Sequence, residues 1–547
     1  MLSFPEFATF RGDPRGQDRW TDNSGEAVLK RRGEQDLVLS ALKLIDRNAL
    51  QTSDQVNYDL LMKQVESQVE GRRFPQEMLP LNQMSGPQQS IAQLMAVTRP
   101  RTAQDYQNMV RRLETADAQI DNDIEWMRKG LEAGVTPPRI TLRDVPQQIR
   151  NQLVDDPADS PMLGAFKSMP ESVDPLQQER LRARAHAAFS ETIAPAFERL
   201  LAFVEEEYIP GARETIGLKD VPDGEAWYAY NVRQRTTLEL SPEEIHEIGL
   251  SEVARIRAEM DRVIESAGFE GSFDAWMEFL RTDPQFYHET AEDLLREYRD
   301  IAKRADPELM KVFGHLPRTP YGIIAVPSYA EKSQTTAYYQ RGSVQAGRPG
   351  YFYANTYALD TRPRWEMEAL TLHEAVPGHH LQIAIQDELE DVPWFRQIGG
   401  YTGFVEGWGL YSESLGEEMG FYTDPYSKFG QLTYEMWRAV RLVVDTGMHH
   451  LGWSRQQAID YFKANAPKQE HDIIVEVDRY IVWPGQALAY KLGELKIKEL
   501  RAFATAELGE DFDIREFHDQ VLGRGAVPLE MLNNNIRAWV AGKKRSD

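Results

Sequence analysis

The sequence contains no cysteine among its 547 residues. This absence excludes disulfides, thiolate zinc sites, iron–sulfur clusters and cysteine nucleophiles together. Histidine is also scarce, with 11 residues in the whole chain. Any metal ion bound by this protein must therefore be held by histidines and carboxylates, and the placement of the few histidines is informative.

The chain also has no excess of positive charge. The 62 lysines and arginines stand against 86 aspartates and glutamates, which gives a formal net charge of −24. A chain this acidic has no overall attraction for nucleic-acid phosphates or anionic lipid, and no motif for nucleic-acid binding is present. Hydrophobic residues make up 41% of the chain, a value typical of a globular protein.

Long hydrophobic runs are the third feature that is lacking. The N-terminal residues include Glu6, Arg11 and Asp13, where a signal peptide has an apolar core of about 7–15 residues. The longest uncharged run, residues 78–98, contains several amides and two prolines, so it does not fit a membrane span. We therefore expect a cytoplasmic protein with no membrane partner.

Helical patterns dominate the sequence. Ser241, Pro242 and Glu244 form a helix start, and an apolar stripe at helical spacing follows it as far as Gly268. A second capping box begins at Ser454, and apolar residues recur at helical spacing over 102–131. Strand signals are confined to about 319–357, chiefly in the segments YGIIAV (321–326) and PGYFYANTY (349–357).

These patterns predict a mostly α protein with a small β-sheet. We expect a large two-lobed fold, with an N-terminal helical lobe at 1–225 and a catalytic lobe at 226–547 that share one cleft. The segments 134–175 and 209–226 are richer in Pro, Asp and Gly, so they are candidates for lobe junctions. The oligomeric state is left open.

The segment LTLHEAVPGHHLQIAI (370–385) begins like the zinc motif H-E-x-x-H, but Pro377 stands where the second histidine would be. On a straight helix, His379 would lie about 9 Å along the axis from His373 and face away from it. His380 would face the same way as His373 but lie about 10.5 Å along the axis. A kink or bulge at Pro377 and Gly378 could bring either histidine to a metal ion. The Gly-His order favours His379, and His380 stays the alternative.

A zinc site of this type needs a third protein ligand, and Glu406 is the candidate. It lies among Phe404, Val405 and Trp408, where an unpaired carboxylate would be costly to bury. The nearby glycines permit close approach of another helix. Glu413 lies on the same helix face and could orient a ligand, but we expect it to be an ordinary structural residue.

Two segments near the C-terminus are candidate walls of the site. In 438–454, Asp445 and His449 stand four residues apart, so the carboxylate could orient the imidazole. In 476–497, Tyr490 could donate a hydrogen bond to an oxyanion. Basic residues in the two segments could bind the C-terminal carboxylate of a peptide, and the candidates are Arg438, Arg441 and Lys491.

These segments together resemble a known family, the bacterial domain-of-unknown-function family 885, which is grouped with the zincin (gluzincin-like) metallopeptidases. The matching segments span nearly the whole chain. They are FPEFATFRGD (4–13), SPEEIHEIGLSEVARIRAEM (241–260), YANTYALDTRPRWEMEALTLHEAVPGHHLQ (353–382), EGWGLYSE (406–413), RLVVDTGMHHLGWS (441–454) and DRYIVWPGQALAYKLG (478–493).

The resemblance implies a zincin-like helical peptidase, similar in plan to thimet oligopeptidases, angiotensin-converting enzymes and Taq-type carboxypeptidases. Some members of the family are lipoproteins, whereas this chain lacks the cysteine of a lipobox. The residues carried over from the resemblance are His373, Glu374, His379 or His380, and Glu406, with looser support for His449 and Tyr490.

The sequence thus predicts a zinc-dependent metallopeptidase that hydrolyses short peptides, either as an oligopeptidase or as a carboxypeptidase. Zn²⁺ is the expected cofactor, Glu374 the general base and a peptide the expected partner. The segment 349–357 could pair with an extended substrate as an added strand. Two alternatives are a metal-dependent hydrolase of other amides or esters and a non-catalytic peptide-binding protein on the same fold.

Overall fold

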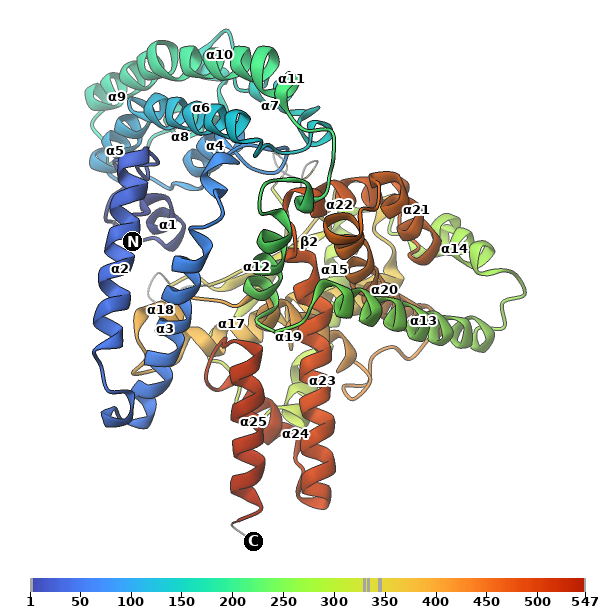
Figure 1. Ribbon diagram of the computed structural model, residues 1–547. Helices are drawn as coiled ribbons and strands as arrows, with labels where there is room; N and C mark the ends of the chain where they lie inside the picture. The colour runs from blue at the N-terminus through green and yellow to red at the C-terminus, as the bar shows by residue number, and fades with distance from the viewer. Residues whose placement is uncertain (1–2, 328–330, 332–334, 343–346, 546–547) are drawn as a thin grey trace. The chain divides into compact units, whose positions relative to one another are not determined.

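The computed structural model describes residues 3–327, 331, 335–342 and 347–545. Helices make up most of this part of the chain, and its strands form one three-stranded sheet. The predicted fold class, mostly α with a small sheet, is confirmed. The chain divides into two compact units, Met1–Trp227 and Tyr228–Asp547 (Figure 1). The predicted boundary at 225/226 falls in α12 (Gly224–Thr236), the helix that runs across this division.

The first unit is built of helices. They are α1 (Pro5–Arg11), α2 (Gly25–Lys43), α3 (Thr52–Gly71), α4 (Pro87–Val97), α5 (Ala103–Leu113), α6 (Ala116–Ala133), α7 (Val145–Arg150), α8 (Gly164–Lys167), α9 (Pro175–Ala188), α10 (Ala194–Phe203) and α11 (Ile209–Gly211). The apolar pattern at 102–131 therefore forms two helices, α5 and α6, and Thr102 caps the first of them in a capping box.

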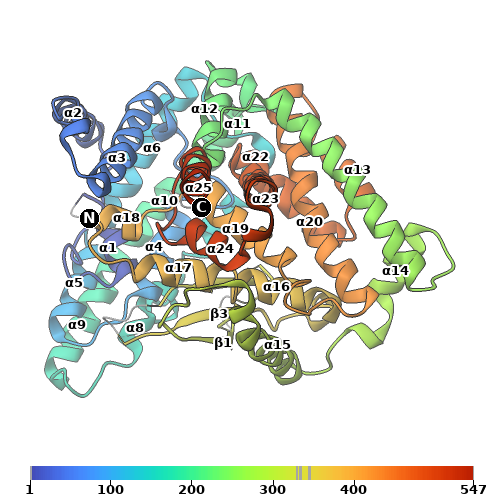
Figure 2. The same ribbon diagram turned by 90° about the horizontal axis from the view of Figure 1, so that it is seen from below.

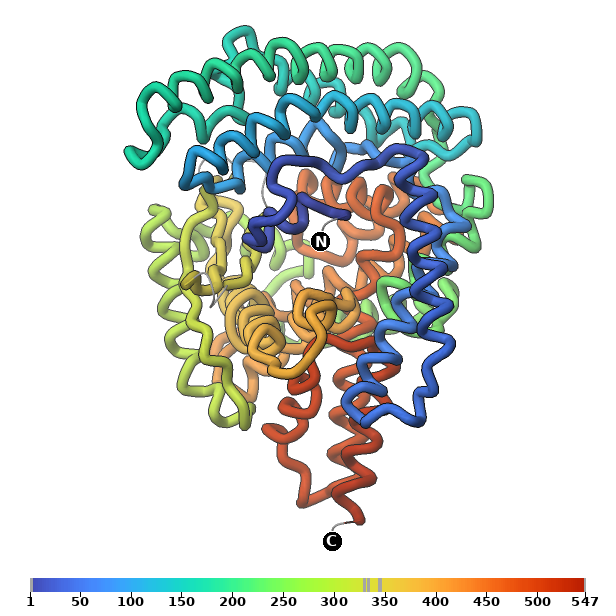
Figure 3. Tube along the Cα trace, turned by 90° about the vertical axis from the view of Figure 1, so that its left-hand side faces the viewer, coloured from blue at the N-terminus to red at the C-terminus, as the bar shows by residue number. Residues whose placement is uncertain are grey.

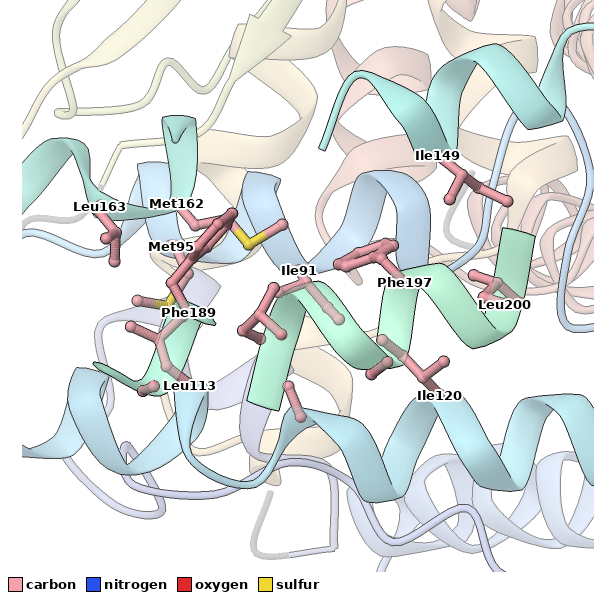
Figure 4. Packing of buried hydrophobic residues seen from close by; sticks show 14 of the residues in the cluster. Ile91, Met95, Leu113, Ile120, Ile149, Met162, Leu163, Phe189, Phe197 and Leu200 are labelled. Atoms are coloured by element: carbon pink, nitrogen blue, oxygen red, sulfur yellow. The ribbon is translucent and has the colours of Figure 1, made fainter. Parts of the chain in front are cut away.

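The core of this unit is apolar and closely packed. Figure 4 shows Ile120 of α6 and Phe197 of α10 within it, and both are fully buried. Ile149 and Met162 also belong to this core, although they come from the segment 134–175. That segment is therefore part of the packed first unit and not a junction between units.

The second unit holds thirteen α-helices among its described residues. They are α13 (Pro242–Ser266), α14 (Phe273–Thr282), α15 (Ala291–Val312), α16 (Met367–Glu374), α17 (His379–Asp387), α18 (Trp394–Ile398), α19 (Thr402–Ser414), α20 (Pro425–Thr446), α21 (Arg455–Asn465), α22 (Glu470–Val482), α23 (Ala489–Leu508), α24 (Ile514–Leu522) and α25 (Leu529–Lys543). The capping boxes predicted at Ser241 and Ser454 are both present, at the starts of α13 and α21. No helix in the described part of the chain combines the length and apolar character needed to cross a lipid bilayer.

The sheet consists of β1 (Tyr321–Ala325), β2 (Ala337–Gln340) and β3 (Gly350–Ala354). Strand β3 lies in the middle, parallel to β1 and antiparallel to β2. Helix α15 packs against β1, as Figure 2 shows, and α16 packs against β2. The prediction that 349–357 pairs with a substrate is wrong for β3, because both of its edges already bind a neighbouring strand.

Helices α19 and α23 lie close together because glycines of the two helices face each other. A Cβ on Gly493 of α23 would lie 1.9 Å from the Gly403 carbonyl oxygen, and one on Gly407 would lie 2.5 Å from the Gly493 Cα. The predicted close approach of another helix to these glycines is thus present. Farther along, α23 lies beside α25, and Figure 3 shows these C-terminal helices in red.

Candidate metal centre

The helix that carries the H-E pair stops directly after it. Helix α16 ends at Glu374, and α17 begins at His379 after the turn 375–378. Proline cannot continue the helical hydrogen-bond pattern here, and a Cβ on Gly378 would lie 1.9 Å from the His373 carbonyl oxygen. The distortion predicted at Pro377 and Gly378 takes the form of a break between two helices.

This break brings His373 and His379 together. Their ring centroids lie 4.7 Å apart with the planes at 89°. Glu406, on α19, faces both: its Oε2 lies 3.5 Å from Nε2 of His379 and 3.9 Å from Nε2 of His373. The three ligand atoms all lie within 4.8 Å of one another. We call His373, His379 and Glu406 the candidate metal centre.

The spacing of these atoms suits a tetrahedral ion. Two donors that are each about 2.1 Å from a tetrahedral zinc ion lie about 3.4 Å from each other. The two carboxylate–imidazole distances, 3.5 and 3.9 Å, are close to that value. Two imidazoles and one carboxylate are also the donor set of one class of catalytic zinc site, so the residues fit the ion.

Access to the centre is one-sided. The side chain of His373 is 4% exposed, whereas those of His379 and Glu406 are 12% and 22% exposed. On the closed side, Gly409 of α19 packs against the imidazoles. A Cβ there would lie 2.9 Å from Nε2 of His373 and 3.2 Å from Cε1 of His379. This glycine lets α19 approach closely enough for Glu406 to reach the two histidines.

Glu413 contacts one of the histidines, as in the alternative to an ordinary structural residue that the sequence left open. Its Oε1 lies 2.7 Å from Nδ1 of His373, and the side chain is fully buried. A carboxylate on Nδ1 keeps the proton on that nitrogen and leaves Nε2 as the ligand atom. The seven-residue spacing from Glu406 signals a shared helix face, but the burial that decides the role is not visible in the sequence.

The pKa shifts of the three residues in the centre partly suit metal binding. Burial lowers the pKa of His373 well below its usual range, which keeps its imidazole neutral. Burial opposes charge on Glu406, but the pairing with His379 and the nearby arginines lower the pKa of this carboxyl. Burial likewise opposes charge on His379, yet Glu406 raises the pKa of this imidazole. A metal ion bound there would displace that proton.

Glu374 is the last residue of α16 and lies next to the centre without belonging to it. Its side chain is buried, which raises the pKa of the carboxyl, while the positive charge of His379 opposes this shift and the negative charge of Glu406 adds to it. The charges of His379 and Glu406 thus act on Glu374, which directly follows His373 in the chain.

His380 points away from the centre. Its Nδ1 lies 2.9 Å from the Tyr339 hydroxyl, and its Nε2 lies 3.1 Å from the Thr319 carbonyl oxygen. Both ring nitrogens are thus engaged beside the sheet, because the start of α17 turns successive side chains in different directions. Of the two alternatives left by the sequence, the geometry brings His379 to the centre and leaves His380 out.

His449 does not join the centre either. It lies in the π-helical segment Gly447–Leu451, is fully buried, and has its Nε2 3.0 Å from the Tyr480 carbonyl oxygen. Asp445, predicted to orient it, accepts hydrogen bonds from the Tyr228 hydroxyl at 2.6 Å and from the Gly485 backbone. The carboxylate therefore ties helix α20 to the turn before α23, which sequence spacing alone does not reveal.

Tyr490, near the start of α23, is affected by the charge of one residue of the centre. Burial raises the pKa of its hydroxyl, and the negative charge of Glu406 adds to this effect. Its ring centroid is 4.6 Å from the guanidinium carbon of Arg441 and 5.9 Å from that of Arg438. Lys491, the next residue, is instead held by three carboxylates, those of Glu252, Glu435 and Glu494.

Fold and site together define a mostly helical protein with a small mixed sheet and a partly buried His–His–Glu cluster next to a further glutamate. Residues 5–536 match the family described as bacterial protein of unknown function (DUF885), and the chain belongs to that family. The resemblance read from the sequence segments is thereby confirmed at the level of the family.

Two solved structures are similar to this chain. The first is described as "the putative lipoprotein from Colwellia psychrerythraea"; it is 29% identical, with a TM-score of 0.92, over 98% of this chain and 96% of that one. The second, "a putative lipoprotein of unknown function from Shewanella oneidensis", is 16% identical, with a TM-score of 0.72, over 97% and 96%. It shows likeness of fold alone. A search of curated proteins finds no match.

Proposed function

We propose that this protein is a zinc-dependent metallopeptidase that hydrolyses short peptides, and that its family is related to the zincins. The observation that carries the proposal is the convergence of His373, His379 and Glu406 from three helices, with Glu374 at their side. A pair of histidines, an adjacent glutamate and a downstream glutamate ligand form the pattern that the resemblance to zincins implies.

The proposed ligands are Nε2 of His373, Nε2 of His379 and the Glu406 carboxylate. Glu413 supports the first of them through its 2.7 Å contact with Nδ1. A zinc ion bound there would supply a Lewis acid that polarises a carbonyl and lowers the pKa of water to about 7. Three protein ligands leave a fourth tetrahedral position open, as in catalytic zinc sites.

Glu374 is the proposed general base. It would take a proton from the attacking water and transfer it to the amine that leaves as the peptide C–N bond breaks, so that one water is consumed for each bond. Burial raises the pKa of this carboxyl, which strengthens it as a proton acceptor. Tyr490 is the proposed hydrogen-bond donor to the developing oxyanion, since its side chain lies near Glu406.

Strand β2 offers a place for the substrate backbone. It forms one edge of the sheet, packs against α16, and its Tyr339 backbone donates a hydrogen bond toward Glu374. An extended peptide could add to such an edge as a further strand. The proposed location in the cytoplasm stays a prediction, because the similar structures from Colwellia and Shewanella are described as putative lipoproteins.

The test is hydrolysis of a peptide library by the zinc-loaded protein, beside panels of simple amides and esters. We expect peptide cleavage that is lost in His379→Ala together with bound zinc. His380→Gln is the matched control: it alters a neighbouring histidine outside the centre and should retain zinc and activity. Turnover of esters alone, or peptide cleavage that survives complete removal of zinc, would contradict the proposal.

A further inference from the structure

Two arginines of α20 lie close to the candidate metal centre with unused hydrogen-bonding capacity. Arg438 and Arg441 stand three residues apart on one face of the helix. Both are buried, with relative exposures of 6% and 4%. Nε of Arg438 and Nη1 of Arg441 are buried without a hydrogen-bond partner in the described part of the chain. Such donors normally find a partner, so each requires an explanation.

Arg438 has no carboxylate within ion-pair distance among the described residues. Its one hydrogen bond goes to the Tyr434 carbonyl oxygen of its own helix, at 3.4 Å. Aromatic rings also lie near it, with ring centroids 4.6 Å away at Tyr434 and 5.1 Å away at Trp437. A buried charge without a close counter-charge is costly, and the Nε of Arg438, which has no partner among the described residues, is a donor that an anion from outside the chain could use.

Arg441 is only partly neutralised. Its Nη2 lies 3.2 Å from Glu476, and its Nε donates to the Tyr480 hydroxyl at 2.8 Å. The same Glu476 carboxylate also pairs with Arg479 at 2.9 Å. Arg441 and Arg479 therefore share one carboxylate.

This positive charge lies close to the centre. Arg438 and Arg441 both act electrostatically on His373 and Glu406, and Arg438 also acts on Glu374. The half-buried ring of Tyr490 lies near both guanidinium groups. Trp437 and Glu476, which contact the arginines, also line a cavity of about 490 Å³. The arginine pair thus contacts residues that line this cavity and acts electrostatically on the proposed catalytic groups.

We propose that Arg438 and Arg441 bind the C-terminal carboxylate of a short peptide, so that the substrates of this protein are peptides with a free C-terminus. The planar guanidinium fork matches a carboxylate in geometry and charge. Of the three basic residues that the sequence offers for this role, Lys491 is excluded because Glu252, Glu435 and Glu494 already neutralise it. The inference rests on the proposed peptidase function for its choice of ligand.

The experiment compares two forms of the same peptide, one with a free C-terminal carboxylate and one with a C-terminal amide. Binding is measured by calorimetry on the zinc-loaded Glu374→Gln protein, and hydrolysis on the wild type. We expect the free acid to bind about 10- to 100-fold more tightly than the amide, which is the range for a charge-assisted hydrogen-bond pair. A third peptide, amidated at its C-terminus but carrying one acidic side chain, separates a terminal from a side-chain carboxylate and should bind as weakly as the amide.

Variants then assign the preference to the arginines. Arg438→Gln should abolish most of the preference for the acid, and Arg438→Lys should restore part of it. The matched control is Arg501→Gln. Arg501 lies on α23 and pairs with Glu418, so its loss should leave the preference unchanged. Thermal unfolding verifies that each variant is folded. If a variant does not fold, the comparison of acid and amide peptides on the wild type still decides the question.

The outcomes separate this inference from the proposed function. Equal binding and cleavage of acid and amide would overturn the carboxylate site while leaving the peptidase intact, as would an unchanged preference in folded Arg438→Gln. Preferential binding of the acid through Arg438 without cleavage of any peptide would support the carboxylate site and refute the peptidase.

Discussion

Replacement of Glu413 by alanine removes the only carboxylate that contacts the outer nitrogen of His373 in the described structure. The Oε1–Nδ1 distance is 2.7 Å, and the carboxylate is fully buried. Without it, Nδ1 loses its acceptor, the imidazole can take the other tautomer, and Nε2 is no longer held as the ligand atom.

The size of the effect follows from this geometry. Loss of a hydrogen-bonded carboxylate behind a metal-ligating histidine weakens metal binding by about 10- to 100-fold, or about 1.4 to 2.8 kcal/mol. Glu413→Gln keeps a carbonyl oxygen in the same place, so its loss should be smaller.

The assay is competition for zinc between the protein and a chromogenic chelator at constant pH, with unfolding of the metal-free proteins measured in parallel. Glu417→Ala is the control, because this exposed acid of the same region pairs with Lys428 and not with a histidine. If folded Glu413→Ala binds zinc as tightly as the wild type, then Glu413 does not orient His373 and the reasoning is refuted.

Three further predictions concern packing and pH. Gly409→Ala places a Cβ 2.9 Å from Nε2 of His373 and should lower zinc affinity in the same competition assay; unchanged affinity would show that the imidazole can move freely. Gly493→Ala places a Cβ 1.9 Å from a carbonyl oxygen of α19 and should cost about 1–3 kcal/mol of unfolding free energy in urea, whereas an unchanged midpoint would contradict the close packing. Burial raises the pKa of Asp123 to about 7 from 3.8; the folded form therefore holds the proton that the unfolded form loses, and stability falls as pH rises from about 4 to 7. This loss of unfolding free energy is at most about 4 kcal/mol, and Asp123→Asn should remove it. Unfolding measured against pH that is identical for both proteins would refute this prediction.

Candidate residues for the metal centre could be named from the sequence because so few residues can supply such ligands. With no cysteine and 11 histidines, a metal ligand set had to use residues such as His373 and a carboxylate in apolar surroundings such as Glu406. The fold class could be predicted for a similar reason, since capping boxes such as that at Ser241 act locally.

The choice between His379 and His380 could not be made from the sequence. On a continuous helix, the number of residues between two positions determines how their side chains are directed relative to each other. Here, however, α16 stops at Glu374 and α17 starts at His379. Once the helix breaks, the path of the turn decides which imidazole meets His373, and that path depends on packing against α19. A proline-glycine pair predicts a break but not its outcome.

The sequence also could not predict the roles of residues whose contacts come from other parts of the chain. Glu413 matters because α16 brings His373 to it, and Lys491 is neutralised by acids on α13 and α20 as well as on its own helix. The central position of β3 depends on pairing with β2, a four-residue strand too short to give a pattern of its own. In each case the deciding contact joins residues far apart in the chain.

The central claim is that Glu374 catalyses peptide hydrolysis beside a zinc ion held by His373, His379 and Glu406. The most direct measurement is peptide hydrolysis by the wild type and by Glu374→Gln, with the zinc content of both determined on the same samples. We predict one zinc per chain in both proteins and a loss of activity in the variant by a factor of at least about 100, the lower end for a general base. Undiminished hydrolysis by zinc-loaded Glu374→Gln, or a wild type that hydrolyses no peptide with zinc bound, would contradict the account.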